Sequence, residues 1–368
     1  MSSRMARQIR TSSKSIIWQI HGNRETEKRP CQTMEKATPR PLVQRILAGY
    51  CARHGLPLIC DESSGQAGFI QLEDGTRRFF RGSHFDLNPL GAAEIADDKA
   101  YTLGFLKRDG YSVPDSLLIH AFDVLAGLRV QKPEIAEHMH SAEDALQFAE
   151  NTGYPVFVKP NSGQEGEDVV RLDARANLER ALTDLLMRHS SLLVQKAIPG
   201  SDLRILVLDG EVLLALHRQP VHVTGDGERS VEELAFSITG INFRDPRVEP
   251  ELTRQGLGPA SIPEEGQTVE LLPNKNLSAG AIAHDVTDQI SDDLKATAIA
   301  ICKALGHRYA GIDLISETPE QTGGSYAVLE VNAAPGLNRY AAQGETELQQ
   351  VIEVYERVFD ALTGHNSQ

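Results

Sequence analysis

Two apolar stretches near the C-terminal end decide how this 368-residue chain folds: Ala310-Gly-Ile-Asp-Leu-Ile315 and Val328-Leu-Glu-Val-Asn332. Short aliphatic runs bounded by turn residues are typical of buried β-strands. Side chains two positions apart project from one face of a strand, so Glu330 and Asn332 share a face. If the two strands pair, Asp313 can share that face as well.

These three side chains carry oxygen atoms that suit one kind of ligand. Two carboxylates and an amide are hard donors of the kind that hold Mg²⁺ together with substrate phosphates. The alternative is that they are surface groups on a half-solvated strand. Apolar neighbours on both sides argue against that alternative, because an unpaired carboxylate in such a strand is costly. We therefore predict that Asp313, Glu330 and Asn332 are metal ligands.

A second feature is a lysine at the end of the apolar run Pro155–Lys159, followed at once by Asn161-Ser-Gly-Gln-Glu-Gly166. Backbone N–H groups of a Gly/Ser loop can surround phosphates, and a lysine at the strand end adds positive charge beside them. The alternative is a strand-end lysine that reaches into solvent.

Two further segments lie between these features. Gln195-Lys-Ala-Ile-Pro-Gly-Ser-Asp202 offers an acceptor, an apolar wall and a carboxylate, which are the groups that an adenine amino group, an adenine face and ribose hydroxyls need. Taken alone, it also reads as an ordinary loop. Arg204 and Arg218 lie on two apolar strands joined by an Asp-Gly turn, and a buried arginine usually has an anionic partner. That partner is either an internal acid or a bound phosphate.

The charge of the chain is distributed unevenly. Residues 1–40 carry nine Lys/Arg and three Asp/Glu, whereas the whole chain has a net charge of −14. The remaining body is therefore strongly acidic, which argues against a nucleic-acid or membrane-surface role. Four cysteines without a Cys-x-x-Cys pair fit a reducing compartment and no zinc site, and no apolar run is long enough to span a membrane. We expect a cytoplasmic protein.

The order of elements predicts an α+β protein in four parts. We expect a disordered tail at 1–40, although a transit peptide and a later start at Met34 remain open. A short N-terminal segment at 41–96, a first subdomain at 97–196 and a metal-binding subdomain at 197–368 follow. The periodicity predicts helices at Leu42–His54, Ile95–Gly110, Ser141–Thr152, Asp288–Leu305 and Glu345–Thr363, and a long polar loop at Asn242–Asn276.

Several stretches taken in order resemble a known family. They are Asp98-Lys-Ala-Tyr-Thr102, Gly153-Tyr-Pro-Val-Phe-Val-Lys-Pro160, Gly200-Ser-Asp-Leu-Arg204, Asn276-Leu-Ser-Ala-Gly280 and Glu330-Val-Asn-Ala-Ala-Pro-Gly336. Over residues from about 90 to 345 the chain resembles the ATP-grasp carboxylate–amine ligases. It is most similar to the ATP-grasp region of cyanophycin synthetase and of bifunctional glutathione synthetases.

The resemblance implies the ATP-grasp fold, in which two α+β subdomains hold ATP between antiparallel sheets, with two Mg²⁺ ions and Mn²⁺ as an alternative. It assigns the metal to Asp313, Glu330 and Asn332, and the transferring phosphoryl group or acyl phosphate to Arg204, Arg218 and Asn276. The residues it assigns to the nucleotide are Lys99, Lys159, Ser162, Gly163, Gly166, Gln195, Lys196, Ile198 and Asp202. Gln195 departs from the family, because a glutamate is usual there.

The function implied is amide or peptide bond formation between amino acids or short peptides through an acyl phosphate, with release of ADP and phosphate. Two alternatives remain open: an ATP-grasp phosphotransferase and a non-catalytic nucleotide-binding module. We expect small-molecule substrates and neither nucleic acid nor membrane as a partner. The resemblance also leaves room for a homo-oligomer.

Overall fold

The computed structural model describes residues 40–163, 168–236, 243, 245, 247–272 and 281–365. The chain from Arg40 to Gln368 forms one compact unit. The predicted tail therefore lies outside the described residues, apart from Arg40 itself. The predicted division into subdomains at 97–196 and 197–368 stays a prediction.

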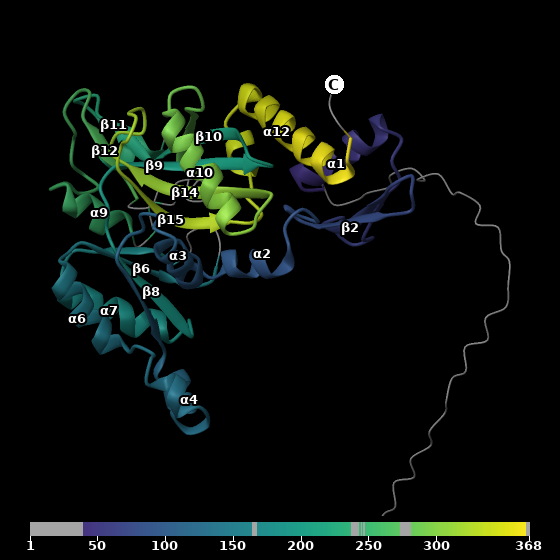
Figure 1. The fold of residues 1–368 in the computed structure, drawn as a ribbon. Helices are drawn as coiled ribbons and strands as arrows, with labels where there is room; N and C mark the ends of the chain where they lie inside the picture. The colour runs from purple at the N-terminus through teal and green to yellow at the C-terminus, as the bar shows by residue number, and fades with distance from the viewer. Residues whose placement is uncertain are drawn as a thin grey trace, which may run out of the picture. The chain divides into compact units, whose positions relative to one another are not determined.

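Runs of strands and helices are interspersed along the described chain (Figure 1). The strands are β1 (Leu58–Cys60), β2 (Ala67–Gln71), β3 (Arg77–Arg81), β4 (His84–Phe85), β5 (Ser116–His120), β6 (Val156–Pro160), β7 (Val170–Leu172), β8 (Ser191–Lys196), β9 (Ser201–Leu208), β10 (Glu211–Gln219), β11 (His222–Thr224), β12 (Thr268–Glu270), β13 (Ile282–Asp285), β14 (Tyr309–Ser316) and β15 (Tyr326–Asn332). The helices are α1 (Leu42–Arg53), α2 (Leu90–Asp97), α3 (Lys99–Arg108), α4 (Phe122–Gln131), α5 (Pro133–Ala136), α6 (Ala142–Thr152), α7 (Arg175–Leu186), α8 (Val231–Phe236), α9 (Val248–Arg254), α10 (Asp292–Ala304), α11 (Asn338–Ala341) and α12 (Glu345–Thr363). The predicted α+β class is confirmed.

The central element is a five-stranded antiparallel sheet in the order β13-β10-β9-β14-β15. Leu203, Ile205 and Ile312 belong to a core on one face, which also contains Leu294 and Ile301 of α10. In the register of the sheet, Asp313 lies opposite Arg204 on one side and opposite Glu330 on the other. Directly paired residues share a face, so this row projects from the face opposite α10.

That second face is divided between a hydrophobic core and a charged region. Leu206, Leu208 and Tyr309 pack into a core shared with α1, α12 and the small sheet β1-β2-β3-β4. The hydroxyl of Tyr50 on α1 donates to Asp360 on α12 at 2.7 Å. Because these elements cover only part of the face, the row containing Asp313 remains beside them as a charged region.

A separate four-stranded sheet has the order β5-β8-β6-β7. Val156, Val158 and Val194 are buried on one face in a core with residues of α6 and α7, which lie along this sheet in Figure 1. Alternation along the strands places Lys159 and Gln195 on the other face. Lys159 and Gln195 therefore lie on the face of the sheet opposite α6 and α7.

Two predicted elements differ from the structure. The single helix expected at Ile95–Gly110 is two helices, because Asp98 has an extended backbone and its side chain accepts from the N–H of Tyr101 to cap α3. The expected loop Asn242–Asn276 contains α9 and β12 in its described part, and β12 pairs with β11. A three-residue strand and a seven-residue helix give too little periodicity to be recognised from sequence.

Other predicted elements are confirmed at nearly the expected bounds, including α1, α10 and α12. Ser141, the first residue of a predicted helix, is the N-cap of α6 and forms a reciprocal capping box with Asp144. Among the described residues, no helix is both long enough and apolar enough to cross a bilayer.

The core between α1 and α12 can be tested by truncation. Leu47 of α1 is 1% exposed within this core, whereas Leu90 at the start of α2 is 76% exposed. Leu47→Ala should lower the free energy of unfolding by about 2–5 kcal/mol through lost burial and a residual cavity. Leu90→Ala should change it by no more than about 0.5 kcal/mol. Urea denaturation of both variants provides the measurement, and equal effects would contradict the packing.

Candidate functional site

The centre of the site is the carboxylate of Asp313, which is 1% exposed in the middle of β14. Arg204 on the neighbouring strand binds both of its oxygens, with Nε and Nη2 each at 2.7 Å. Arg218 of β10 donates to the same carboxylate through Nη1 at 3.0 Å. The open question about Arg204 is thereby answered, because its partner in this structure is an internal acid.

The buried charges of this network balance one another. Burial by itself would raise the pKa of Asp313, but the guanidinium groups of Arg204 and Arg218 hold it well below its usual value. Arg218 is 5% exposed and also binds Asp202, with Nε at 2.7 Å from Oδ1. Burial opposes the charge of Arg218, yet Asp202 and Asp313 raise its pKa. Asp313 and Arg218 are thus charged at neutral pH.

Glu330 and Asn332 lie beside Asp313 on the same face of the sheet. Glu330 is directly opposite Asp313, and the amide of Asn332 donates to Glu330 at 3.3 Å. Gly311 is two residues before Asp313, and a Cβ there would lie 2.9 Å from Pro335. Glycine therefore lets the turn after Asn332 approach the strand closely.

The side-chain oxygens of Asp313, Glu330 and Asn332 are also the ones that could bind a metal. The interpretation of Asp313 as a surface acid is wrong, while the side chain of Glu330 is 27% exposed. Within the described chain, no group of three His, Cys, Asp or Glu residues is placed to hold a metal ion by itself. A cation at this face would therefore need further oxygens, as Mg²⁺ does when it is bound with phosphates.

Two lysines from the first half of the chain meet these acids. Lys99 at the start of α3 has its Nζ 3.6 Å from Glu330 Oε2 and donates to the carbonyl of Gly163 at 3.1 Å. Lys159 is 8% exposed and donates to Gln195 Oε1 at 3.0 Å. The interpretation of Lys159 as a solvent-reaching lysine is wrong. The structure thus brings both lysines to the region of Asp313 and Glu330.

Burial lowers the pKa of Lys159 to about 8. The carboxylate of Glu330 opposes this shift, and the positive charge of Lys99 adds to it. Gln195 Oε1 accepts a hydrogen bond from this ammonium. An anionic ligand such as a phosphate would supply a negative charge to pair with this ammonium.

Asn161 organises the start of the loop that follows Lys159. It is 4% exposed, its amide donates to Asp98 Oδ2 at 2.7 Å and its side-chain oxygen accepts from the N–H of Ala100 at 2.9 Å. The sequence indicated Asn161 only as the first residue of a loop. Its position directly before Ser-Gly, with Asp98 capping the helix of Lys99, is the signal that could have indicated this contact.

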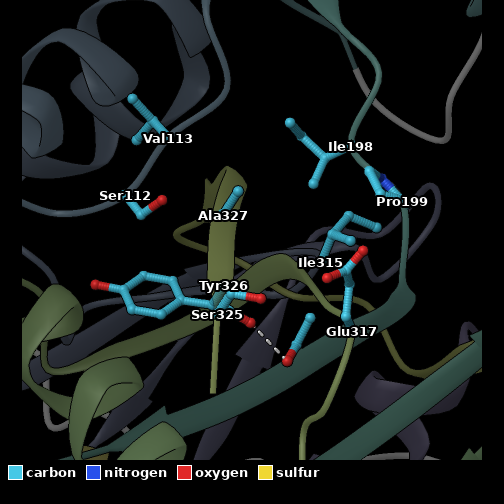
Figure 2. Close-up of a pocket in the computed structure, with 10 residues that line it drawn as sticks. Ser112, Val113, Ile198, Pro199, Ile315, Glu317, Ser325, Tyr326 and Ala327 are labelled. Carbon is cyan, nitrogen blue, oxygen red and sulfur yellow. Dashed lines mark hydrogen bonds between the residues drawn. The ribbon is translucent and has the colours of Figure 1, made fainter. Parts of the chain in front are cut away.

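The remaining predicted nucleotide residues divide into three groups. Ile198 lines a pocket of about 230 Å³ together with Val113 and Ile315, as Figure 2 shows. Ser162 and Gly163 are exposed at the start of the loop. Gly166 and Asn276 lie outside the described residues.

Lys196 does not join the other residues. Its Nζ donates to the carbonyl oxygens of Gly153 and Tyr154 at 2.7 and 3.3 Å. It lies opposite Val156, which is buried in the core beneath α6 and α7. The side chain of Lys196 is therefore directed away from the face of Lys159, and only its main chain is left to contact a ligand there.

Two antiparallel sheets that bring lysines, arginines and carboxylates together define a class of nucleotide-dependent proteins. Residues 96–226 and 272–355 match the RimK-like ATP-grasp domain. The chain belongs to this ATP-grasp family, and the predicted resemblance is confirmed.

Individual relatives agree with this assignment. The chain is 30% identical over 284 residues to the glutathione biosynthesis bifunctional protein GshAB of Enterococcus faecalis, covering 71% of this chain and 35% of the relative. It is 29% identical over 270 residues to cyanophycin synthetase of Geminocystis herdmanii, covering 68% and 29%. The chain thus spans about a third of the length of these relatives.

A solved structure supports the predicted fold. The crystal structure of a bifunctional glutathione synthetase from Pasteurella multocida superposes with a TM-score of 0.52 at 23% identity. The match covers 82% of this chain and 41% of that one. The predicted ATP-grasp fold is confirmed.

If Lys159 binds a phosphate, nucleotide binding should depend on pH. The ammonium of Lys159 is charged below its pKa of about 8 and neutral above it. Affinity for Mg²⁺-ATP should therefore fall as the pH rises from about 7 to about 9. Lys159→Arg keeps its charge over this range, so its affinity should change less. Calorimetric titration across the range provides the measurement, and a flat wild-type profile would contradict the phosphate role.

Proposed function

We propose that this chain is an ATP-dependent carboxylate–amine ligase that forms an amide bond through an acyl phosphate and releases ADP and phosphate. The observation that carries the proposal is the convergence of Lys99 and Lys159 with Asp313 and Glu330. Two cations from one half of the chain and two acids from the other suit a nucleotide triphosphate bound with a divalent cation.

The oxygen donors are compatible with Mg²⁺. Asp313 is ionised, and Glu330 and Asn332 lie beside it on one face. ATP-grasp ligases in general use ATP and a divalent metal. We propose that this chain binds two Mg²⁺ ions through these three residues, with Mn²⁺ as a substitute that accepts the same oxygens. The metal would neutralise charge on the phosphates when bound.

The chain's own residues would act mainly by position and charge. Lys99 and Lys159 would bind phosphate oxygens, while the substrate carboxylate attacks the γ-phosphorus and ADP leaves. Arg204 and Arg218 are held by Asp313 close to where the acyl phosphate would form, so they can stabilise its charge. The amine then attacks the acyl carbon, phosphate leaves, and the amine loses a proton. We also propose that Asn276 contacts the acyl phosphate.

We propose that the remaining predicted residues contact the nucleotide. Ser162, Gly163 and Gly166 would surround phosphates, and Gln195, Ile198 and Asp202 would hold the base and ribose. Because Asp202 is engaged by Arg218, a ribose would have to share or replace that contact. Lys196 would contribute through its main chain.

We propose amino acids or short peptides as the substrates on both sides of the bond. The support is the similarity to proteins named for glutathione biosynthesis and cyanophycin synthesis. A cytoplasmic location, a homo-oligomeric state and the lack of nucleic-acid and membrane partners remain parts of this proposal. A panel of amino-acid pairs assayed for ADP formation, with mass spectrometry of the products, would identify the substrates.

A non-catalytic nucleotide-binding module is the second candidate. The observation that favours it is the engagement of both oxygens of Asp313 by Arg204 and Arg218. A ligase must release phosphate only when an acid and an amine are both present. Mg²⁺-ATP binding without phosphate release across the substrate panel would support the module instead. Formation of a stable phosphate ester without an amine would support a phosphotransferase.

The central carboxylate offers a direct test of the proposal. Asp313→Asn keeps the shape of the side chain but removes its charge, so turnover should fall at least about 10²-fold. Asp292→Asn, at a fully exposed position on α10, is the matched control and should retain wild-type activity. Initial rates of ADP formation provide the measurement. A folded Asp313→Asn enzyme with near-normal turnover would contradict the proposal.

The metal assignment can be tested at a more exposed position. Glu330→Gln removes one anionic oxygen ligand but leaves the two arginines paired with Asp313. The Mg²⁺ concentration for half-maximal rate should therefore rise at least about 10-fold. Glu143→Gln, on α6 with a side chain that is 80% exposed, is the control. An unchanged Mg²⁺ requirement in Glu330→Gln would rule out this ligand.

A further inference from the structure

In the side-chain amide of Gln195, the oxygen is hydrogen-bonded, whereas the nitrogen has no hydrogen-bond partner among the described residues. Gln195 lies within β8 and is 3% exposed. Its Oε1 accepts from Lys159 Nζ at 3.0 Å. Within the part of the chain that the structure describes, its Nε2 is buried without a hydrogen-bond partner. A buried donor of this kind needs an explanation, because leaving it unpaired costs free energy.

The chemistry of the lysine fixes the orientation of the amide. An ammonium has only donors, so it must face the amide oxygen; a rotated amide would place donors against donors. Nε2 is therefore the group that Gln195 offers to anything else bound nearby. A glutamate here would be different, because its second oxygen would remain as an acceptor.

The position of Gln195 relates this donor to the nucleotide. Gln195 and Lys159 lie on the face of their sheet opposite the core formed with α6 and α7. Lys159 in turn lies within electrostatic range of Lys99 and Glu330. Ile198, three residues after Gln195, lines the pocket in Figure 2. If this face holds the nucleotide, Gln195 is a buried polar side chain on it, one residue before the end of β8 and the segment that leads to β9.

We propose that Gln195 is a base-selectivity residue and that this chain accepts 6-oxopurine nucleotides, GTP or ITP, alongside ATP. The inference rests on the proposed function, because it concerns the nucleotide of that same site. A buried N–H donor is matched by an acceptor on the ligand. Guanine offers two acceptors along this edge, O6 and N7, whereas adenine offers N7 and has an amino group at position 6.

The same comparison explains why both bases are accepted. Adenine can still satisfy Nε2 through N7, so ATP is retained. Guanine and hypoxanthine are not rejected, because Gln195 presents an N–H donor rather than a carboxylate to their C6 carbonyl. A glutamate would reverse this preference by accepting from the adenine amino group and repelling the carbonyl.

The test compares two nucleotides across matched variants by calorimetric titration with Mg²⁺-ATP and Mg²⁺-GTP. The variants are wild type, Gln195→Glu and Gln147→Glu, the last at an exposed position on α6 that gains the same charge. The readout is the ratio of the two dissociation constants. A change in the charge of Lys159 alters the binding of the phosphates of both nucleotides alike. The ratio of dissociation constants therefore reports the contribution of the base.

In the wild type, GTP should bind within about 10-fold of ATP. Gln195→Glu should shift the ratio at least about 10-fold toward ATP, whereas Gln147→Glu should leave it unchanged. Gln195→Met, which removes the donor without adding charge, should weaken the binding of GTP more than the binding of ATP. This variant provides the test if the glutamate variant does not fold. GTP binding more than about 10-fold weaker than ATP in the wild type, or a ratio unaffected at position 195, would overturn the inference. Binding of neither nucleotide would instead overturn the proposed function itself.

Discussion

The buried carboxylate of Asp313 is the constraint on which the site depends. A charge at 1% exposure inside a strand is tolerated because two arginines from neighbouring strands bind it. Those contacts require the register that pairs Asp313 with Arg204 and Glu330, and the hydrophobic cores on both faces hold this register. The polar site is therefore a consequence of how the sheet is paired.

The network also explains how a face rich in carboxylates is compatible with an anionic ligand. Arg204 and Arg218 neutralise the carboxylates that would otherwise repel one another, and Lys99 lies 3.6 Å from Glu330. In the proposed function, a divalent cation bound with phosphates would take over this neutralising role and leave the arginines available to the reacting groups. Asn161 and Asp98 join the helix of Lys99 to the loop after Lys159, so the cations of the first half of the chain are positioned together.

The sequence predicted much of this arrangement because its signals are local. Spacing by two along a strand placed Glu330 and Asn332 on one face, and ordered motifs indicated the ATP-grasp fold, which is confirmed. It could not show that Lys196 is directed toward the opposite side of its sheet, nor that Asp98 interrupts a helix, because both depend on register and capping in three dimensions. The pairing of Lys159 with Gln195 joins residues 36 positions apart, which no local pattern reveals. The roles of the site residues stay predictions.

A crystal structure of the chain with Mg²⁺ and a non-hydrolysable ATP analogue tests the central claim most directly. The account predicts metal–oxygen distances of about 2.0–2.1 Å to Asp313 and Glu330, with the phosphates beside Lys99 and Lys159. Nucleotide bound at another surface, with Asp313 still enclosed by Arg204 and Arg218, would contradict it.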